Sequence, residues 1–126
     1  MTSLNDIIKQ AMEFVLSGDT EILKILRNQY YKSIITNIDK SSVGCFTEFK
    51  IIGEIQKINP QNAYIGDVYL ESEHLESRMG IILFIENGII SMLEFYTYGD
   101  DILPNGFESY KFVYENGKRD FNSYLS

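Results

Sequence analysis

The sequence is poor in the residues on which disulfides and covalent catalysis depend, because its 126 residues include one cysteine and one histidine. The lone Cys45 cannot form a disulfide within the chain. His74 lies 29 positions further along the sequence, and no Cys-His pair or Ser-His-Asp arrangement has local support. We therefore expect Cys45, in the aromatic run Gly44-Cys45-Phe46, to be a buried, inert thiol rather than a nucleophile.

Long hydrophobic runs are also missing. The longest, residues 79–85, is far short of the roughly 20 residues that span a bilayer. The first 25 residues lack the basic start, continuous apolar run and small-residue cleavage site of a signal peptide. These absences predict a cytoplasmic protein with no membrane segment.

Recognisable cofactor motifs are absent as well. The glycines of the second half are separated turn residues and form no phosphate-binding loop. His74 has Glu73 and Glu76 beside it, but this spacing matches no closed structural metal site, so a surface turn is preferred over a metal centre. We accordingly expect no enzyme: no catalytic residue, cofactor or metal is assigned.

Basic residues are scarce in one half of the chain. Residues 1–63 carry seven acidic and seven basic residues, whereas residues 64–126 carry eleven acidic and four basic ones, so the whole net charge of −7 lies in the second half. Between Asp67 and Glu108, nine acidic residues accompany Arg78 alone. This distribution argues against nucleic-acid binding, which needs clustered Lys and Arg, and favours a basic protein partner.

Apolar residues are plentiful: 44% of the chain is hydrophobic and 13% aromatic, which is enough for a compact core. Two stretches with apolar residues at every third or fourth position lie on either side of Ser17-Gly18. Ser3 can cap the first stretch, and Asp19 or Thr20 the second. The spacing predicts a helical hairpin over about 3–32.

The period then changes to that of β-strands. Strands are expected around 34–38, 43–52, 63–73, 79–98 and 109–114, the fourth range being a hairpin about Asn87-Gly88, a strong two-residue turn signal. We therefore predict one α+β domain spanning 1–126, with the N-terminal helical hairpin packed on a mainly antiparallel sheet of about five strands over about 33–115. The tail, 116–126, is expected to be less ordered, although Phe121, Tyr124 and Leu125 could dock on the core.

Acidic residues of the second half follow the strand period. In residues 67–73, period two places three acidic residues and a tyrosine on one face, with Val68 and Leu70 on the other. If this strand neighbours the second strand of the hairpin, the two form one acidic, tyrosine-bearing surface. The candidate partner-binding residues are Asp67, Tyr69, Glu71, Glu73, Glu94, Tyr96 and Tyr98.

Three interpretations of this surface are open. Paired carboxylates could perform acid/base chemistry as in glycoside hydrolysis, but the chain offers no obvious lid or second lobe. The surface could be a solvated sheet face whose charges discourage edge-to-edge aggregation. It could also bind a protein, with tyrosines as anchors and carboxylates selecting a basic partner.

Four segments resemble a small, mostly uncharacterised bacterial family of similar length. They are Gly44–Phe49, Ile65–Glu71 with His74-Leu75-Glu76, Gly80–Gly88 and Ile90–Tyr98, which carry GDVYxE-like and GxxLFxExGxISMLExYTY-like patterns. The chain departs from the family at Phe95, where glycine is frequent, and at Cys45, where a larger aromatic is found. The resemblance implies no catalytic residue; small acidic bacterial proteins of this kind include many immunity proteins of interbacterial toxin systems.

The leading hypothesis is therefore a non-enzymatic binding protein, an immunity protein that neutralises a cognate, basic toxin by occluding it through the acidic surface. The alternative is a small ligand-binding or regulatory α+β protein that forms a homodimer through an exposed strand edge.

Overall fold

The computed structural model describes residues 1–126 and has an α+β architecture, as predicted, with every strand pair antiparallel. The elements follow the chain in the order β1 (Thr2–Ser3), α1 (Leu4–Val15), α2 (Glu21–Tyr31), β2 (Ser33–Lys40), β3 (Gly44–Ile51), β4 (Ala63–Glu71), β5 (Met79–Glu86), β6 (Ile89–Tyr96), β7 (Gly106–Phe107) and β8 (Lys111–Tyr114).

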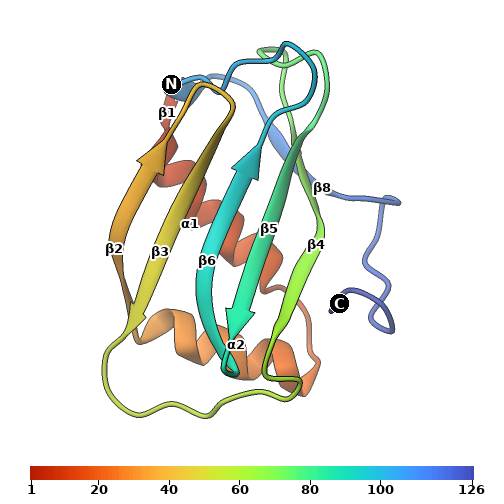
Figure 1. Cartoon of the computed structure of the whole chain (residues 1–126). Helices are drawn as coiled ribbons and strands as arrows, with labels where there is room; N and C mark the ends of the chain where they lie inside the picture. The colour runs from red at the N-terminus through yellow and green to blue at the C-terminus, as the bar shows by residue number, and fades with distance from the viewer.

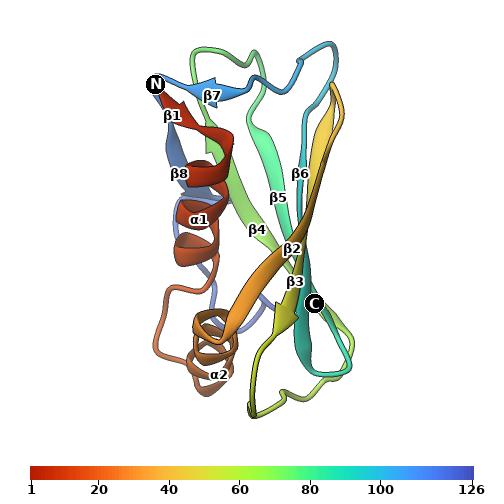
Figure 2. The same ribbon diagram turned by 90° about the vertical axis from the view of Figure 1, so that its left-hand side faces the viewer.

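The main sheet has six strands in the order β2-β3-β6-β5-β4-β8, in agreement with the predicted sheet of about five strands (Figure 1). The two short strands β1 and β7 form a separate pair at the end of the sheet where the chain begins (Figure 2). They escaped the sequence analysis because two residues are too few to show a period. Strand β5 lies between β4 and β6, so the two strands that carry the candidate binding residues are not neighbours.

Both helices lie on one face of the sheet (Figure 2). The side chain of Ser3 accepts a hydrogen bond from the Asp6 amide at the start of α1, and that of Thr20 accepts one from the Leu23 amide at the start of α2. The helices do not pack side by side as a tight hairpin: α1 runs along the strands, whereas α2 crosses them at one end (Figures 1 and 2). Neither helix has the length and apolar composition that crossing a membrane requires.

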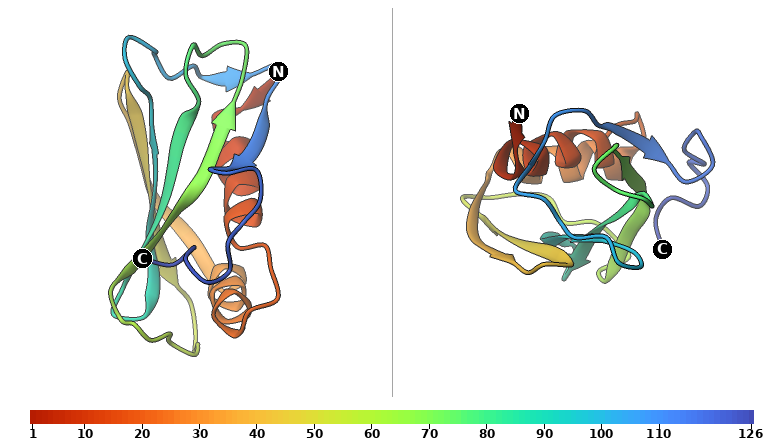
Figure 3. Two further views of the ribbon diagram at one scale, coloured as in Figure 1. Left: turned by 90° about the vertical axis from the view of Figure 1, so that its right-hand side faces the viewer. Right: turned by 90° about the horizontal axis from the view of Figure 1, so that it is seen from above.

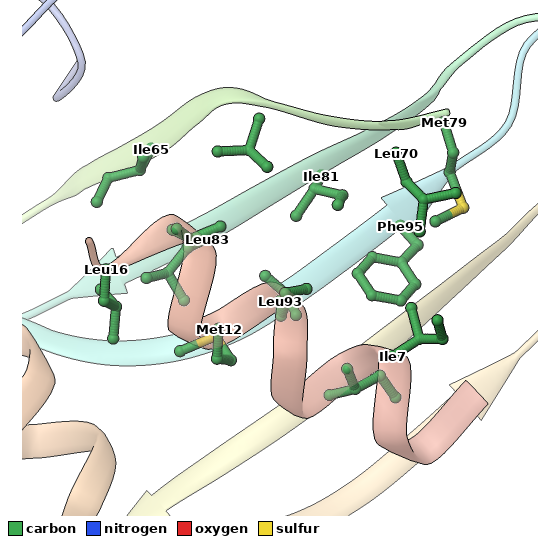
Figure 4. Close-up of a cluster of buried hydrophobic side chains, with 14 of the residues drawn as sticks. Ile7, Met12, Leu16, Ile65, Leu70, Met79, Ile81, Leu83, Leu93 and Phe95 are labelled. Atoms are coloured by element: carbon green, nitrogen blue, oxygen red, sulfur yellow. The ribbon is translucent and has the colours of Figure 1, made fainter. Parts of the chain in front are cut away.

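One hydrophobic cluster of 25 buried residues fills the space between the helices and the sheet. Figure 4 shows its centre, where Ile7 and Met12 of α1 face Leu83, Leu93 and other residues of the central strands. The amphipathic pattern of α1 accounts for its share, since all six of its buried residues repeat at the predicted three- and four-residue spacing.

The β5–β6 hairpin turns at Asn87-Gly88, as predicted, with both residues at positive φ, 54° and 76°. Helix α2 holds this turn through Gln29, which is fully buried. Its amide nitrogen donates to the carbonyl oxygens of Gln56 and Gly88 at 2.8 and 2.9 Å, and its carbonyl accepts from the Ile90 amide at 2.9 Å. One side chain thus joins the helix layer, the β3–β4 connection and the hairpin.

The C-terminal segment, 116–126, folds back onto the molecule, so the expectation of a less ordered tail is wrong (Figure 3). Ser126 and Tyr64 exchange two backbone hydrogen bonds of 2.8 and 2.9 Å, and Tyr124 is buried in the core cluster. The signal was present in Tyr124 and Leu125, both of which pack as the docking alternative required. Arg119, which the sequence analysis did not single out, anchors the segment.

Candidate functional site

No helix covers the second face of the main sheet, which we call the open sheet face (Figure 2). An antiparallel sheet of this kind normally alternates apolar residues inward with polar residues outward. Here the outward positions are largely apolar or aromatic, and most are half-buried, although Phe46, Glu48 and Tyr64 are exposed. They include Phe46 and Glu48 of β3, Met92, Glu94 and Tyr96 of β6, Ile82 and Phe84 of β5, and Tyr64 and Tyr69 of β4.

A tyrosine cluster, formed by Tyr69, Tyr96 and Tyr98, occupies one end of this face. In register, Tyr69 pairs with Gly80 and Gly80 pairs with Tyr96, so the two tyrosines stand on either side of a glycine. The ring of Tyr96 lies over Gly80, where a Cβ atom would come within 1.9 Å of it. The Tyr98 hydroxyl donates to the Tyr96 hydroxyl at 3.2 Å. Gly80 is therefore needed for close approach, and a side chain there would displace Tyr96.

A cation borders the cluster. The guanidinium of Arg78 lies 4.4 Å from the centre of the Tyr69 ring and donates to the Glu115 carbonyl at 3.3 Å. Burial raises the pKa of Tyr69, and burial together with hydrogen bonds to Tyr98 and Tyr69 raises the pKa of Tyr96. Tyrosine hydroxyls are already protonated at neutral pH, and the raised pKa extends that state to higher pH, so both side chains can donate hydrogen bonds and serve as apolar anchors.

Glu94 lies in the middle of the open sheet face without a charged partner. It faces Phe46 on one neighbouring strand and Ile82 on the other. The two ion pairs of the chain, Lys111–Glu71 and Arg119–Asp67, do not involve it. Burial raises the pKa of the Glu94 carboxyl above its usual range. An unpaired carboxylate held among apolar side chains costs stability, which is typical of a residue kept for binding.

Replacing Glu94 with Gln is expected to raise the melting temperature slightly at pH 7 and to leave it unchanged near pH 3. Because folding raises the pKa of Glu94, its contribution to stability is present below the unfolded pKa and lost as the pH rises through the folded pKa. Gln mimics the protonated carboxyl at every pH. Since the carboxyl is partly exposed, a gain on the order of 1–2 °C is expected.

Thermal melts at both pH values measure this difference. Glu48→Gln, which removes an exposed carboxylate on the same face, is the matched control and is expected to change the melting temperature less at pH 7. A lower melting temperature for Glu94→Gln than for the unsubstituted chain at pH 7 would contradict the account of Glu94.

The structure brings together only part of the predicted acidic surface. Glu71 lies on the same strand and face as Tyr69, but it pairs with Lys111 at 3.5 Å, where both side chains are exposed. Glu73 lies beyond the end of β4 in an exposed turn. Since β5 separates β4 from β6, the acidic residues of these strands do not form the contiguous patch that neighbouring strands would have made.

Asp67 is engaged in the fold. Its two carboxylate oxygens accept hydrogen bonds from Nε and Nη2 of Arg119 at 2.9 and 3.0 Å. It lies in a bulge of β4, between Ile65 and Val68, which the strict two-residue period did not foresee. Asp67 was predicted to lie on a binding surface because its sequence neighbours give no sign of a cationic partner 52 positions further along the chain.

Several side chains of the open sheet face were not recognised in the sequence. Phe46, Ile82 and Phe84 were predicted as parts of strands and not as parts of a surface. The available signal was β5 itself, which is apolar at both odd and even positions over 79–85 and therefore cannot hide every side chain beneath one helix layer.

The other candidate groups have no chemical partner. Cys45 is buried and faces the core, and burial raises the pKa of its thiol, consistent with the inert thiol predicted. His74 lies exposed in the turn after β4, and its Nε2 accepts from the Glu108 amide at 3.5 Å. No group of three or more His, Cys, Asp or Glu side chains is placed to hold a metal ion.

A pocket of about 510 Å³ lies against the C-terminal segment. Ten residues line it, among them Asp67, Arg119 and Tyr124, and only two of the ten are hydrophobic. Small-molecule sites are usually mostly apolar. The two strongest polar groups here, the Asp67 carboxylate and the Arg119 guanidinium, already satisfy each other. The pocket is thus polar, its Asp67–Arg119 pair belongs to the fold, and the open sheet face is the stronger candidate.

Comparison of the chain with protein-family models, curated proteins and solved structures finds no match.

Proposed function

We propose that this chain is a non-enzymatic protein-binding domain that docks the open sheet face onto a basic surface of its partner. The partner class that fits best is a cognate toxin, which the chain neutralises as an immunity protein does, by covering the active site. The binding face includes the tyrosines and Glu94, as the sequence hypothesis had it. The apolar side chains around Glu94 take the place of Asp67 and Glu73.

The observation that carries the proposal is the composition of the open sheet face. Aromatic and aliphatic side chains flank the unpaired carboxylate of Glu94, with the exposed Glu48 nearby on the same face, and no helix covers them. Interfaces have this anatomy, with partly buried aromatic anchors at the centre and few charges among them. A face that served only for solubility would carry polar side chains at Ile82 and Phe84.

The charge expected of the partner's surface follows from the charges of this chain. Of the nine acidic residues between Asp67 and Glu108, Asp67 and Glu71 pair with Arg119 and Lys111; the other seven accompany Arg78 alone, in a range that contains β5 and β6, the central strands of the sheet. Negative potential over this region speeds the approach of a positive surface and disfavours neutral or acidic ones. Toxins that cut nucleic acid need a basic active-site cleft to hold phosphates, so an acidic, aromatic face is complementary to such a cleft.

A single substitution on the open sheet face is expected to weaken the complex strongly. Glu94→Lys places a cation where a basic partner must approach and removes the only carboxylate in the apolar centre, so the dissociation constant is expected to rise at least tenfold. The association rate of the unsubstituted chain is expected to fall several-fold between about 50 and 500 mM salt. Both quantities are measured by surface plasmon resonance with the partner purified after capture from native lysate.

The matched control is Glu13→Lys, an exposed residue of α1 on the opposite side of the molecule. It changes the net charge by the same amount, so an equal loss of affinity in both variants would mean that total charge, not this face, governs binding.

Neutralisation itself is tested in cells. The captured partner, expressed alone, is expected to arrest growth, and co-expression of this chain is expected to restore it, whereas the Glu94→Lys chain is not. If the captured partner does not arrest growth, the immunity function is contradicted, whereas the binding face is not.

A further inference from the structure

The two edges of the main sheet differ. One edge is β8, four residues long and followed by the folded C-terminal segment. The other is β2, eight residues long, whose outer side pairs with no other strand (Figure 1). Ile34 and Ile35 of this edge are 50% and 36% exposed. A long, unpaired edge with exposed isoleucines is a template for another strand.

The hydrogen bonds at the two ends of β2 identify which of its residues face outward. At one end the Ser41 amide donates to the Gly44 carbonyl, and at the other the Ile52 amide donates to the Lys32 carbonyl. In an antiparallel pair, bonded and non-bonded residues alternate. The alternation counted from one end of β2 is out of step with the alternation counted from the other end. The bulge between Ile35 and Asn37 accounts for this difference of one residue. The residues with N–H and C=O groups directed to the free edge are Ser33, Ile35, Ile38 and Lys40.

This set is symmetric about the bulge. An antiparallel copy of β2 placed along the edge, with Ile35 opposite Ile38, also sets Ser33 opposite Lys40, so every outward residue meets an outward residue. Without the bulge, Ile35 and Ile38 would have backbone groups pointing in opposite directions. Their side chains also share a face, because they pair with Phe49 and Thr47 of β3, both of which face the helices.

The side chains agree with this register. The two Ile35–Ile38 pairs bring apolar groups together on the helix side, and Ile34 meets Asp39 on the open side. No two residues of like charge stand opposite each other, which cross-strand pairing requires. We infer that β2 pairs with β2 of a second copy, and that the chain forms a two-fold symmetric dimer with one continuous sheet across the interface. This dimer is independent of the proposed partner and leaves the open sheet face of both copies free.

Sedimentation equilibrium over a concentration series is expected to show a species of twice the 14.6 kDa chain mass. Ile35→Lys, which sets a cation against the apolar pair twice in each dimer, is expected to raise the dimer dissociation constant at least tenfold. Ile34→Lys, the same change at the neighbouring residue, sets the cation opposite Asp39 of the second copy and is expected to leave the constant unchanged or lower it. A dimer weakened equally by both substitutions would overturn the register.

Hydrogen exchange supplies a readout that does not depend on substitutions. The amides of Ser33, Ile35, Ile38 and Lys40 are expected to become protected as the concentration rises, while amides bonded to β3 stay protected throughout. A chain that remains monomeric at the highest concentration, or a dimer in which these four amides exchange freely, would overturn the inference. Melts of dilute Ile35→Lys, where the monomer prevails, check that the variant is folded.

Discussion

Replacing Arg119 with Ala is expected to lower the free energy of unfolding by about 3–5 kcal/mol, because it leaves buried polar groups without partners. The Arg119 side chain is 1% exposed. It makes two bonds to the Asp67 carboxylate, and its Nη1 donates to the carbonyls of Val15 and Ser17 at 2.7 and 2.9 Å, at the end of α1. Its guanidinium also lies 4.8 and 5.3 Å from the ring centres of Tyr114 and Tyr124.

The melting temperature is expected to fall by roughly 10–20 °C in a calorimetric scan. Lys118→Ala, the exposed neighbour in the sequence, is the control and is expected to stay within about 0.5 kcal/mol of the unsubstituted chain. Asp67→Ala is also expected to destabilise, and the double variant is expected to lose less than the two single losses together, because each removes the other's partner. Strictly additive losses would mean that the Arg119–Asp67 bonds contribute little.

Replacing Gln29 with Leu is expected to lower the free energy of unfolding by about 2–4 kcal/mol, although Leu has a similar size and a higher hydrophobicity. The substitution leaves the buried Ile90 amide without its partner and removes one hydrogen bond each from the carbonyls of Gln56 and Gly88, of which Gly88 keeps its bond from the Ile58 amide. Chemical denaturation with urea measures the loss.

Two comparisons isolate the hydrogen bonds of Gln29. Asn28→Leu, the exposed neighbour on α2, is expected to leave stability nearly unchanged. Hydrogen exchange of the Ile90 amide is expected to accelerate in Gln29→Leu, since the bond that protects it is lost. An unchanged midpoint together with an unchanged exchange rate at Ile90 would refute the role of this side chain as a clamp on the hairpin.

The sequence predicted on which face of its strand each candidate residue lies, but not which residues together form one surface. Alternation along β4 and β6 correctly separated Tyr69 from Leu70 and Glu94 from Phe95, because side chains of a strand point to opposite faces whatever lies beside it. Which strands are neighbours depends on the path of the whole chain. The sequence hypothesis joined β4 to β6, whereas β5 lies between them and supplies Gly80, over which Tyr96 lies.

The roles of Asp67 and Gln29 could not be predicted from the sequence either. Their residue types and sequence neighbours are ordinary, and each is explained only by contacts with groups more than 25 positions away. Asp67 is a structural ion-pair partner rather than a binding residue because Arg119 returns to it from the C-terminal segment. Gln29 is a polar residue on the buried face of an amphipathic helix because the hairpin turn needs its amide.

The sequence alone determined the features that depend on interactions within a few residues: the two capped helices, the Asn87-Gly88 turn and the alternation of the strands. The acidic second half follows directly from the composition. Tertiary structure decided the order of the strands, the fate of each carboxylate and the exposure of an aromatic sheet face around Glu94. These properties depend on distant segments packing against one another, and their burial and pairing energies are set only when those segments meet.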